Sequence, residues 1–275
     1  MTRILHLSDT HVSAAGPDED GVDGVAALRG LLHDVRHVPG IDLVVVSGDV
    51  ADDGSAQGCR SVRDLVGAFA DERGIPHVYS TGNHDARMPF REALGSGHHG
   101  IPARLLDDDL CAAVGRVGGL RVVTLDSLVP GQVHGRLGGR QLGLLADVLA
   151  DPAPQGTILV LHHPPIVVPA LPHVARVGLQ DADALAEVVR GSDVRAILTG
   201  HLHFAVGGAL AGVPVWVTPG VVTRIDTTAP PHLVRGVLGA GATIVELDAG
   251  GAAPTFHLLH ARDARAGEQV YEVAL

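Results

Sequence analysis

Aspartate, histidine and asparagine residues recur in five short blocks along this chain of 275 residues. Carboxylate and amide oxygens and imidazole nitrogens are the atoms with which proteins bind divalent metal ions. Two adjacent metal ions can hold a hydroxide in line with a phosphorus centre and share the charge that develops as a phosphate ester breaks. In chain order the blocks are Asp9-Thr10-His11, Gly48-Asp49, Gly82-Asn83-His84-Asp85, Leu161-His162-His163-Pro164-Pro165 and Gly200-His201-Leu202-His203. They predict a paired metal site of this kind.

Each block follows a short apolar segment that is typical of a buried β-strand. Ligand sites of α/β folds lie just beyond the carboxyl ends of their strands, so the positions of the blocks agree with the chemistry of their residues. The predicted strands cover residues 4–7, 41–46, 77–79, 157–161 and 194–198.

Helical periodicity separates these strands at residues 22–38, 55–73, 142–149 and 182–189, and Ser55 is placed to cap the second helix. Alternating strands and helices predict an α/β fold. Hairpins are expected where residues 110–117 meet 120–125, 204–210 meet 213–217, and 242–247 meet 255–259. The hairpins after about residue 204 would complete the second sheet or form a dimer or pocket edge.

No linker or internal repeat divides the chain, so residues 1–275 are expected to form one domain. The segment 219–241 is rich in glycine and proline and is predicted to be a surface loop or flap. His98 and His99 lie in a glycine-rich segment and could edge the pocket, but a surface position is expected for both.

The composition favours a cytoplasmic protein with no membrane span. Hydrophobic residues make up 46% of the chain, but no apolar run has the length of a transmembrane helix and none at the N-terminus resembles a signal peptide. Cys59 and Cys111 are the two cysteines, and we expect both to be free thiols.

The formal charge of −11 argues against a nucleic-acid-binding protein, which would present a basic patch. All 20 basic residues are arginines, which excludes lysine Schiff-base chemistry and the lysine-dependent P-loop. A small phosphate substrate remains compatible with the acidity, because bound metal ions invert the local potential.

Taken together, the five blocks resemble the calcineurin-like metallophosphoesterase superfamily, which they match without a substitution from Asp9 to His203. The resemblance implies a four-layer α/β/β/α sandwich of two mixed sheets flanked by helices, with two metal ions between the sheets. It assigns Asp9, His11, Asp49 and His203 to the first metal, and Asp49, Asn83, His162 and His201 to the second, with Asp49 bridging.

Residue chemistry supports this partition. A carboxylate has two oxygens and can bridge two cations, whereas the amide of Asn83 adds an oxygen ligand without adding negative charge. Mixed nitrogen and oxygen ligation suits iron, manganese, zinc or cobalt. His84 is predicted to be the catalytic residue that binds no metal, stabilising the transition state or donating a proton to the leaving group, with Asp85 orienting its ring. His163 is expected to support the site rather than to bind metal.

The second block distinguishes branches of the superfamily. Serine/threonine phosphatases read Gly-Asp-x-x-Asp-Arg-Gly there, whereas this chain has Asp53 in place of the arginine. A carboxylate at that position repels a phosphomonoester dianion more than a diester monoanion. The first, third and fourth blocks resemble the class III cyclic nucleotide phosphodiesterases of bacteria, which implies hydrolysis of 3′,5′-cyclic AMP to 5′-AMP.

Alternatives remain open from the sequence. Other small diesters, such as glycerophosphodiesters or 2′,3′-cyclic nucleotides, suit the same site, and a nuclease is disfavoured by the acidity. A non-catalytic scaffold of the same fold would have lost ligands or His84, and this chain retains them. Phe204 is one of few aromatic residues that could stack on a base. By analogy with relatives, the chain is expected to form a homodimer.

Overall fold

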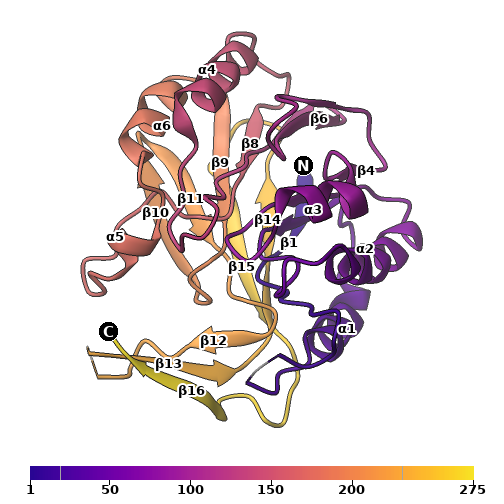
Figure 1. Ribbon diagram of the computed structural model, residues 1–275. Helices are drawn as coiled ribbons and strands as arrows, with labels where there is room; N and C mark the ends of the chain where they lie inside the picture. Colours follow the sequence, from indigo (N-terminus) through magenta and orange to yellow (C-terminus); the bar gives the residue numbers. More distant parts are fainter. Residues whose placement is uncertain (19, 231) are drawn as a thin grey trace.

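The computed structural model describes residues 1–18, 20–230 and 232–275, and two large mixed β-sheets form its centre (Figure 1). The first sheet has the order β15 (Thr255–His260), β14 (Gly241–Leu247), β1 (Thr2–Leu7), β2 (Leu43–Ser47), β3 (His77–Ser80) and β4 (His98–His99). The second has the order β10 (Val206–Leu210), β11 (Val213–Val217), β9 (Val194–Thr199), β8 (Thr157–Val160), β7 (Leu120–Thr124), β6 (Ala113–Val117) and β5 (Ala103–Leu105).

Helices cover the outer faces of both sheets. On the first sheet lie α1 (Gly24–Asp34), the 3₁₀ turn η1 (Val35–His37), α2 (Ala56–Asp71) and α3 (Arg87–Leu94); on the second lie α4 (Gly138–Leu149) and α6 (Ala182–Val189). The short α5 (Val174–Val177) packs beside β11 and the segment after β9. This arrangement confirms the predicted α/β/β/α layering.

Side-chain alternation along the strands builds three successive core layers. On β1, Leu5 and Leu7 point toward α1 and α2, whereas Ile4 points the other way into a layer shared by both sheets. Ile158 on β8 enters that middle layer from the opposite sheet, and its neighbour Leu159 packs under α4 and α6. The two sheets are thus held face to face by a single buried layer.

The predicted hairpins are confirmed. The two that follow residue 204 belong to different sheets. The pair β10–β11 extends the second sheet beside β9, whereas β14–β15 extends the first sheet beside β1. The Ser55 side chain caps α2 by accepting a hydrogen bond from the backbone N–H of Gly58.

The prediction of a loop or flap over residues 219–241 is wrong in part, because two strands lie within it. β12 (Thr223–Ile225) and β13 (Leu233–Leu238) pair with β16 (Gln269–Ala274) in a small antiparallel sheet, seen beneath the two large sheets in Figure 1. β16, the partner of β13, comes from a distant part of the chain. No local hairpin pattern in the sequence therefore reveals the pairing of these two strands.

The expectation that His98 is a surface residue is also wrong. His98 pairs with Val78 in the ladder between β4 and β3 and is only 7% exposed. No helix in the described part of the chain is long and apolar enough to cross a membrane.

Candidate metal centre

The five blocks meet at one edge of the two sheets. β1, β2 and β3 run parallel in the first sheet, and β8 and β9 run parallel in the second. Because the carboxyl ends of parallel strands lie at the same edge, the residues that follow these five strands converge where the sheets face each other. The candidate ligands therefore come from both sheets.

Backbone strain gathers at the same positions. Six described non-glycine residues have a positive φ, and one of them, Ala211, lies in the β10–β11 turn. The other five are candidate ligands: Asp9, His11, Asp49, His201 and His203. Left-handed backbone is unfavourable for residues with a Cβ and persists where the surrounding structure holds it, often at functional sites.

Glycines allow the blocks to approach one another closely. A Cβ on Gly82 would lie 2.2 Å from Oδ1 of Asp49, and a Cβ on Gly200 would lie 1.8 Å from Oγ of Ser8 and 2.7 Å from Oδ2 of Asp9. Any larger residue at either position would have to displace a candidate ligand or the backbone beside it.

Three histidine rings are held by hydrogen bonds at Nδ1. Nδ1 of His11 lies 2.8 Å from Oδ1 of Asp52, that of His162 lies 2.8 Å from the carbonyl oxygen of Ser47, and that of His203 lies 2.9 Å from Oγ1 and 3.2 Å from the carbonyl oxygen of Thr223. Carboxylate and carbonyl oxygens only accept hydrogen bonds, so Nδ1 carries the proton in the neutral rings and Nε2 keeps its lone pair. Metal-binding histidines are typically fixed in this way.

The Nε2 atoms of these three rings lie close to one another or to side-chain oxygens of the site. Nε2 of His11 lies 3.2 Å from Nε2 of His203, which in turn lies 3.3 Å from Oδ1 of Asp9. Nε2 of His162 lies 3.1 Å from Oδ2 of Asp49 and 3.2 Å from Oδ1 of Asn83. Lone pairs this close repel unless a proton or a cation lies between them, so the donor set fits positively charged ions.

The charges of the site agree with that conclusion. Asp9 and Asp49 are 0% and 2% exposed, and burial alone would raise the pKa of both carboxyls. The nearby imidazoles of His203 and His162 outweigh burial and lower both pKa values. Burial likewise opposes charge on His162, yet Asp49 and Asp9 raise its pKa to about 9. Buried carboxylates this close together need positive charge among them.

Two sets of three residues bring their ligand atoms within 4.8 Å of one another around the aspartates: Asp9 with His11 and His203, and Asp9 with Asp49 and His162. The first set lies within the ligands predicted for the first metal. The second joins both predicted metal positions, as expected for ligands of a paired centre.

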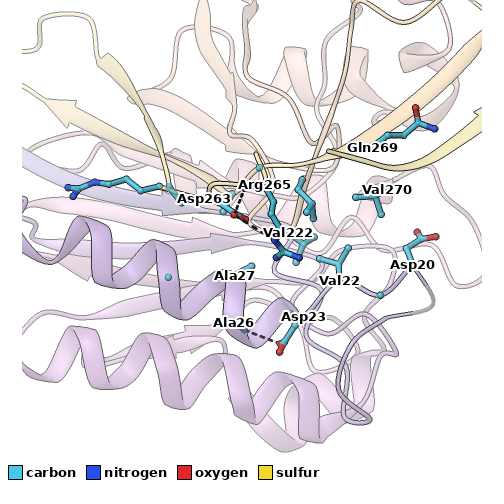
Figure 2. Close-up of a pocket in the computed structure, with 17 residues that line it drawn as sticks. Asp20, Val22, Asp23, Ala26, Ala27, Val222, Asp263, Arg265, Gln269 and Val270 are labelled. Carbon is cyan, nitrogen blue, oxygen red and sulfur yellow. Dashed lines mark hydrogen bonds and ion pairs between the residues drawn. The ribbon is translucent and has the colours of Figure 1, made fainter. Parts of the chain in front are cut away.

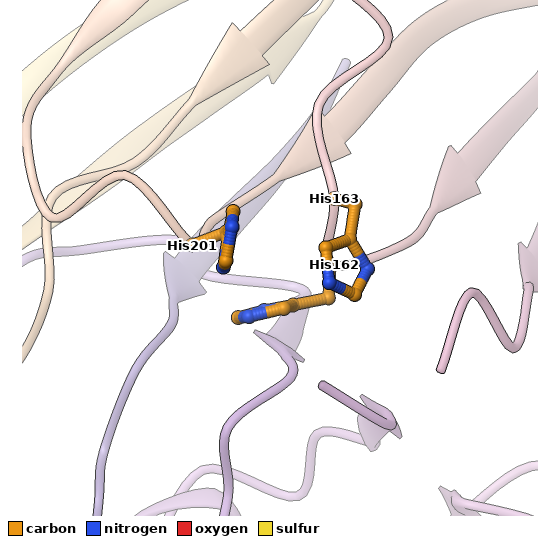
Figure 3. A group of neighbouring side chains, drawn as sticks. All are labelled: His162, His163 and His201. Atoms are coloured by element: carbon orange, nitrogen blue, oxygen red, sulfur yellow. The ribbon is translucent and has the colours of Figure 1, made fainter. Parts of the chain in front are cut away.

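His201 approaches from the end of β9 toward the ring of His162 (Figure 3). Their ring centroids are 5.0 Å apart, and the backbone N–H of His201 donates to both carboxylate oxygens of Asp9. His163 lies beside them with both ring nitrogens engaged, Nδ1 2.8 Å from Oγ of Ser127 and Nε2 3.1 Å from the carbonyl oxygen of Val133. This pairing fits a supporting role for His163.

The ring of His84 covers the site from the solvent side. Its side chain is 42% exposed, its centroid lies 4.6 Å from that of His11, and its backbone N–H donates to Oδ1 of Asp49. Nδ1 lies 3.1 Å from the carbonyl oxygen and 3.3 Å from Oδ1 of Asp52. The hydrogen bond to Asp52 raises the pKa of His84 to about 10.

The expectation that Asp85 orients His84 is wrong. Both oxygens of Asp85 accept hydrogen bonds from backbone N–H groups, those of Val50, Ala51 and Gly82. The carboxylate thus ties the second block to the third. Burial raises the pKa of Asp85 to about 7, although these N–H groups oppose the shift.

Asp52 is a candidate functional residue that the sequence did not single out. Its one carboxylate contacts both His11 and His84, and His11, Asp52 and His84 bring their polar atoms within 4.8 Å of one another. The sequence signal that could have identified Asp52 is its position three residues after Asp49, directly beyond the second block.

Another hollow, of about 460 Å³, lies beside the first turn of α1 (Figure 2). None of the candidate ligands lines it, and its charged side chains include Asp23, which caps α1, and Arg265, which lies 3.8 Å from Asp263. It belongs to a different part of the surface from the clustered histidines.

Comparison with known sequences agrees with the geometry. The family described as Calcineurin-like phosphoesterase matches residues 2–205. A cAMP/cGMP dual specificity phosphodiesterase of Mycobacterium tuberculosis is 40% identical over 248 residues, which cover 89% of this chain and 75% of the relative. A 3′,5′-cyclic adenosine monophosphate phosphodiesterase of Pseudomonas aeruginosa is 31% identical over 203 residues, which cover 73% of this chain and 69% of the relative.

Solved structures support the fold. A purple acid phosphatase from yellow lupin seeds superposes with a TM-score of 0.61 at 13% identity. The superposition covers 99% of this chain and 53% of that longer chain, so the likeness concerns the shared fold alone.

Proposed function

Because this chain belongs to the calcineurin-like phosphoesterase family, we propose that it is a phosphodiesterase that uses two divalent metal ions and hydrolyses 3′,5′-cyclic AMP to 5′-AMP. The observation that carries the proposal is the convergence of imidazole Nε2 atoms, carboxylates and an amide oxygen at one point between the sheets. The names of the relatives supply the substrate class.

Asp49 would be shared by the two metal ions, since it contacts residues of both predicted ligand sets. When bound, the metal ions activate a water molecule and neutralise charge on the phosphate oxygens. The first position would be held by Asp9, His11, Asp49 and His203, and the second by Asp49, Asn83, His162 and His201. Manganese, iron, zinc and cobalt all suit these ligands.

His84 acts on the substrate rather than on the metals. Its ring lies over the cluster and is the exposed member of the group, so it can reach a phosphate oxygen or the departing oxygen. Asp52 fixes the ring through Nδ1, which leaves Nε2 to face the substrate. A hydrogen bond or proton from this position stabilises the charge that forms as the ester bond breaks.

The charge distribution favours a diester over a monoester. Asp53 stands where the serine/threonine phosphatases have an arginine. Its carboxylate accepts hydrogen bonds from the backbone N–H groups of Ala14 and Ser55. A cyclic nucleotide carries one negative charge on its phosphate, whereas a monoester dianion needs more positive charge for binding. Other small diesters are the second candidate substrates.

One domain comprising the whole chain is supported by the buried layer that both sheets share. A cytoplasmic location and a homodimer also stay predictions.

The decisive experiment measures hydrolysis by metal-free protein with and without added Mn²⁺. The substrates are 3′,5′-cyclic AMP, bis(p-nitrophenyl) phosphate and p-nitrophenyl phosphate. We expect metal-dependent turnover of both diesters and little turnover of the monoester.

The other outcomes separate the alternatives. Cleavage of bis(p-nitrophenyl) phosphate without cleavage of cyclic AMP would retain the phosphodiesterase and reject its substrate. Metal binding without turnover of any of the three would indicate a scaffold.

A further inference from the structure

A second cavity, of about 260 Å³, opens directly beside the candidate metal centre. His201, a candidate ligand, is one of its lining residues, so the cavity and the metal centre share a wall. Its volume lies below the roughly 300–1,000 Å³ of pockets that enclose a whole drug-sized ligand. The cavity therefore has the size for part of a substrate whose phosphate lies at the metals.

The walls of this cavity are mainly apolar. Of the ten described residues that line it, seven have apolar side chains, among them Phe204 and Ile225. Val133 and Leu275, two others of the seven apolar residues, have side chains that are 57% and 53% exposed. Exposed apolar side chains grouped around a concave surface mark a binding site.

One cationic side chain stands at the same cavity without a partner. The guanidinium of Arg176 forms no hydrogen bond or ion pair with another described residue. A guanidinium stacks on aromatic ring faces and donates hydrogen bonds to ring nitrogens and carbonyl oxygens. Apolar walls and one free guanidinium suit a flat heteroaromatic ring.

We propose that this cavity binds the purine base of the substrate, with Phe204 and Val133 contacting the ring and Arg176 at its edge. The inference rests on the proposed function, because it places the base of a cyclic nucleotide whose phosphate lies beside His201. The subsite is formed by the segment before α4, by α5, by the segment after β9 and by the small sheet with Leu275.

The apolar walls alone would discriminate only weakly between bases. Apolar walls cannot strongly reject a ring that differs only in its polar substituents, whereas a site built of paired hydrogen-bonding groups can. We expect kcat/KM for cyclic AMP and cyclic GMP to agree within about tenfold.

The test compares cyclic AMP with the same cyclic ribose phosphate lacking a base. Phe204→Ala removes the ring from the cavity wall, and Val133→Ser changes an exposed position where folding is not at risk. Leu105→Ser is the matched control, because Leu105 is an exposed apolar residue on β5, outside the cavity. Loss of stacking should lower kcat/KM for cyclic AMP about tenfold or more in Phe204→Ala and leave the abasic substrate within about twofold.

A binding measurement accompanies the kinetics. Wild-type protein should bind 5′-AMP about tenfold or more tightly than ribose 5-phosphate, and Phe204→Ala should remove most of that difference. Equal losses on both substrates, or no loss on cyclic AMP in either variant, would overturn the subsite. If wild-type protein hydrolyses neither cyclic substrate, the proposed function fails, and the preference for 5′-AMP then decides separately whether the cavity binds a base.

Discussion

Oδ1 of Asp52 lies 2.8 Å from Nδ1 of His11, and the same oxygen lies 3.3 Å from Nδ1 of His84. One carboxylate therefore orients a candidate metal ligand and the candidate catalytic histidine together. Hydrogen bonding to both rings, the one to His11 foremost, lowers the pKa of Asp52 well below its usual value, so it remains ionised. Asp52 thus links the position of a candidate metal ligand to that of the proposed proton donor.

Replacing Asp52 should therefore weaken both functions. Asp52→Ala removes the acceptor that holds His11 with Nε2 toward the metal, and we expect metal affinity to fall about 10- to 100-fold. Titration of metal-free protein with Mn²⁺ measures this loss. Asp52→Asn keeps an acceptor oxygen and should lose less, while Asp53→Asn serves as the control because Asp53 bonds to Ala14 and Ser55 instead. Unchanged affinity in Asp52→Ala would contradict the orienting role.

His84→Ala should separate catalysis from metal binding. Its ring contacts Asp52 and His11 at the exposed side of the cluster, and its loss removes a donor from the substrate side of the site. We expect turnover of cyclic AMP to fall about 10²- to 10⁴-fold with metal content near that of the wild type. Elemental analysis of the purified variant measures its metal content. Loss of the metals would contradict the role assigned to His84.

Asp49→Ala should have the opposite signature. Asp49 contacts His162 at 3.1 Å and His11 at 3.6 Å, which places its carboxylate between the two predicted metal positions. We expect the variant to lose most of its bound metal as well as its activity, because one residue serves both ions. Asn83→Ala, which touches one position, should lose less metal. Full metal occupancy in Asp49→Ala would contradict the assignment of Asp49 as a ligand of both metals.

The alternation of strands and helices and the position of the five blocks at strand ends could be predicted because both depend on local patterns, whereas the four-layer order and the ligand assignment were implied by the resemblance to the family. Apolar strands that end in Asp, Asn or His, such as the strand before Asp49, can be recognised within ten residues. The contacts of Asp85 and Asp52 could not be predicted in this way. Which of two nearby carboxylates reaches His84 depends on the turn geometry of two separate blocks, and Asp85 instead binds backbone N–H groups of the second block and of its own.

The small sheet illustrates a different reason for failure. β13 pairs with β16 across thirty residues of intervening chain, so the segment 219–241 has no complete local strand pattern. That sheet also supports the site, because Thr223 at the start of β12 holds Nδ1 of His203. Part of the metal centre is thus positioned by a segment that resembles a loop in the sequence.

Gly82→Ala should disrupt the site through a single methyl group. The added Cβ would lie 2.2 Å from Oδ1 of Asp49 and 2.3 Å from its backbone nitrogen, so the third block would have to move away from the second. We expect metal content and activity to fall together. Gly143→Ala is the matched control: a Cβ there meets nothing within 4 Å on α4, and replacing a helical glycine should stabilise the fold by about 0.5–1 kcal/mol. Thermal unfolding and elemental analysis of both variants make the comparison.

Acid should destabilise the protein partly through His98, which lies away from the metal centre. Burial lowers the pKa of His98 to about 4; its Nε2 lies 3.1 Å from Oγ1 of Thr124, and its buried Nδ1 has no described partner. Because the pKa in the folded state lies below the unfolded value of about 6.5, the unfolded chain takes up the proton first as pH falls. This contribution to stability is complete above pH 6.5 and is lost progressively toward pH 4.

Between pH 7 and pH 5, His98 alone should cost about 2 kcal/mol of unfolding free energy. His98→Gln keeps a polar group for Thr124 but does not titrate, so its stability should fall less over the same interval. Urea unfolding of both proteins at the two pH values measures the difference between the slopes. Equal slopes would show that His98 is already protonated in the folded state or is accessible to solvent there, contrary to its buried place on β4.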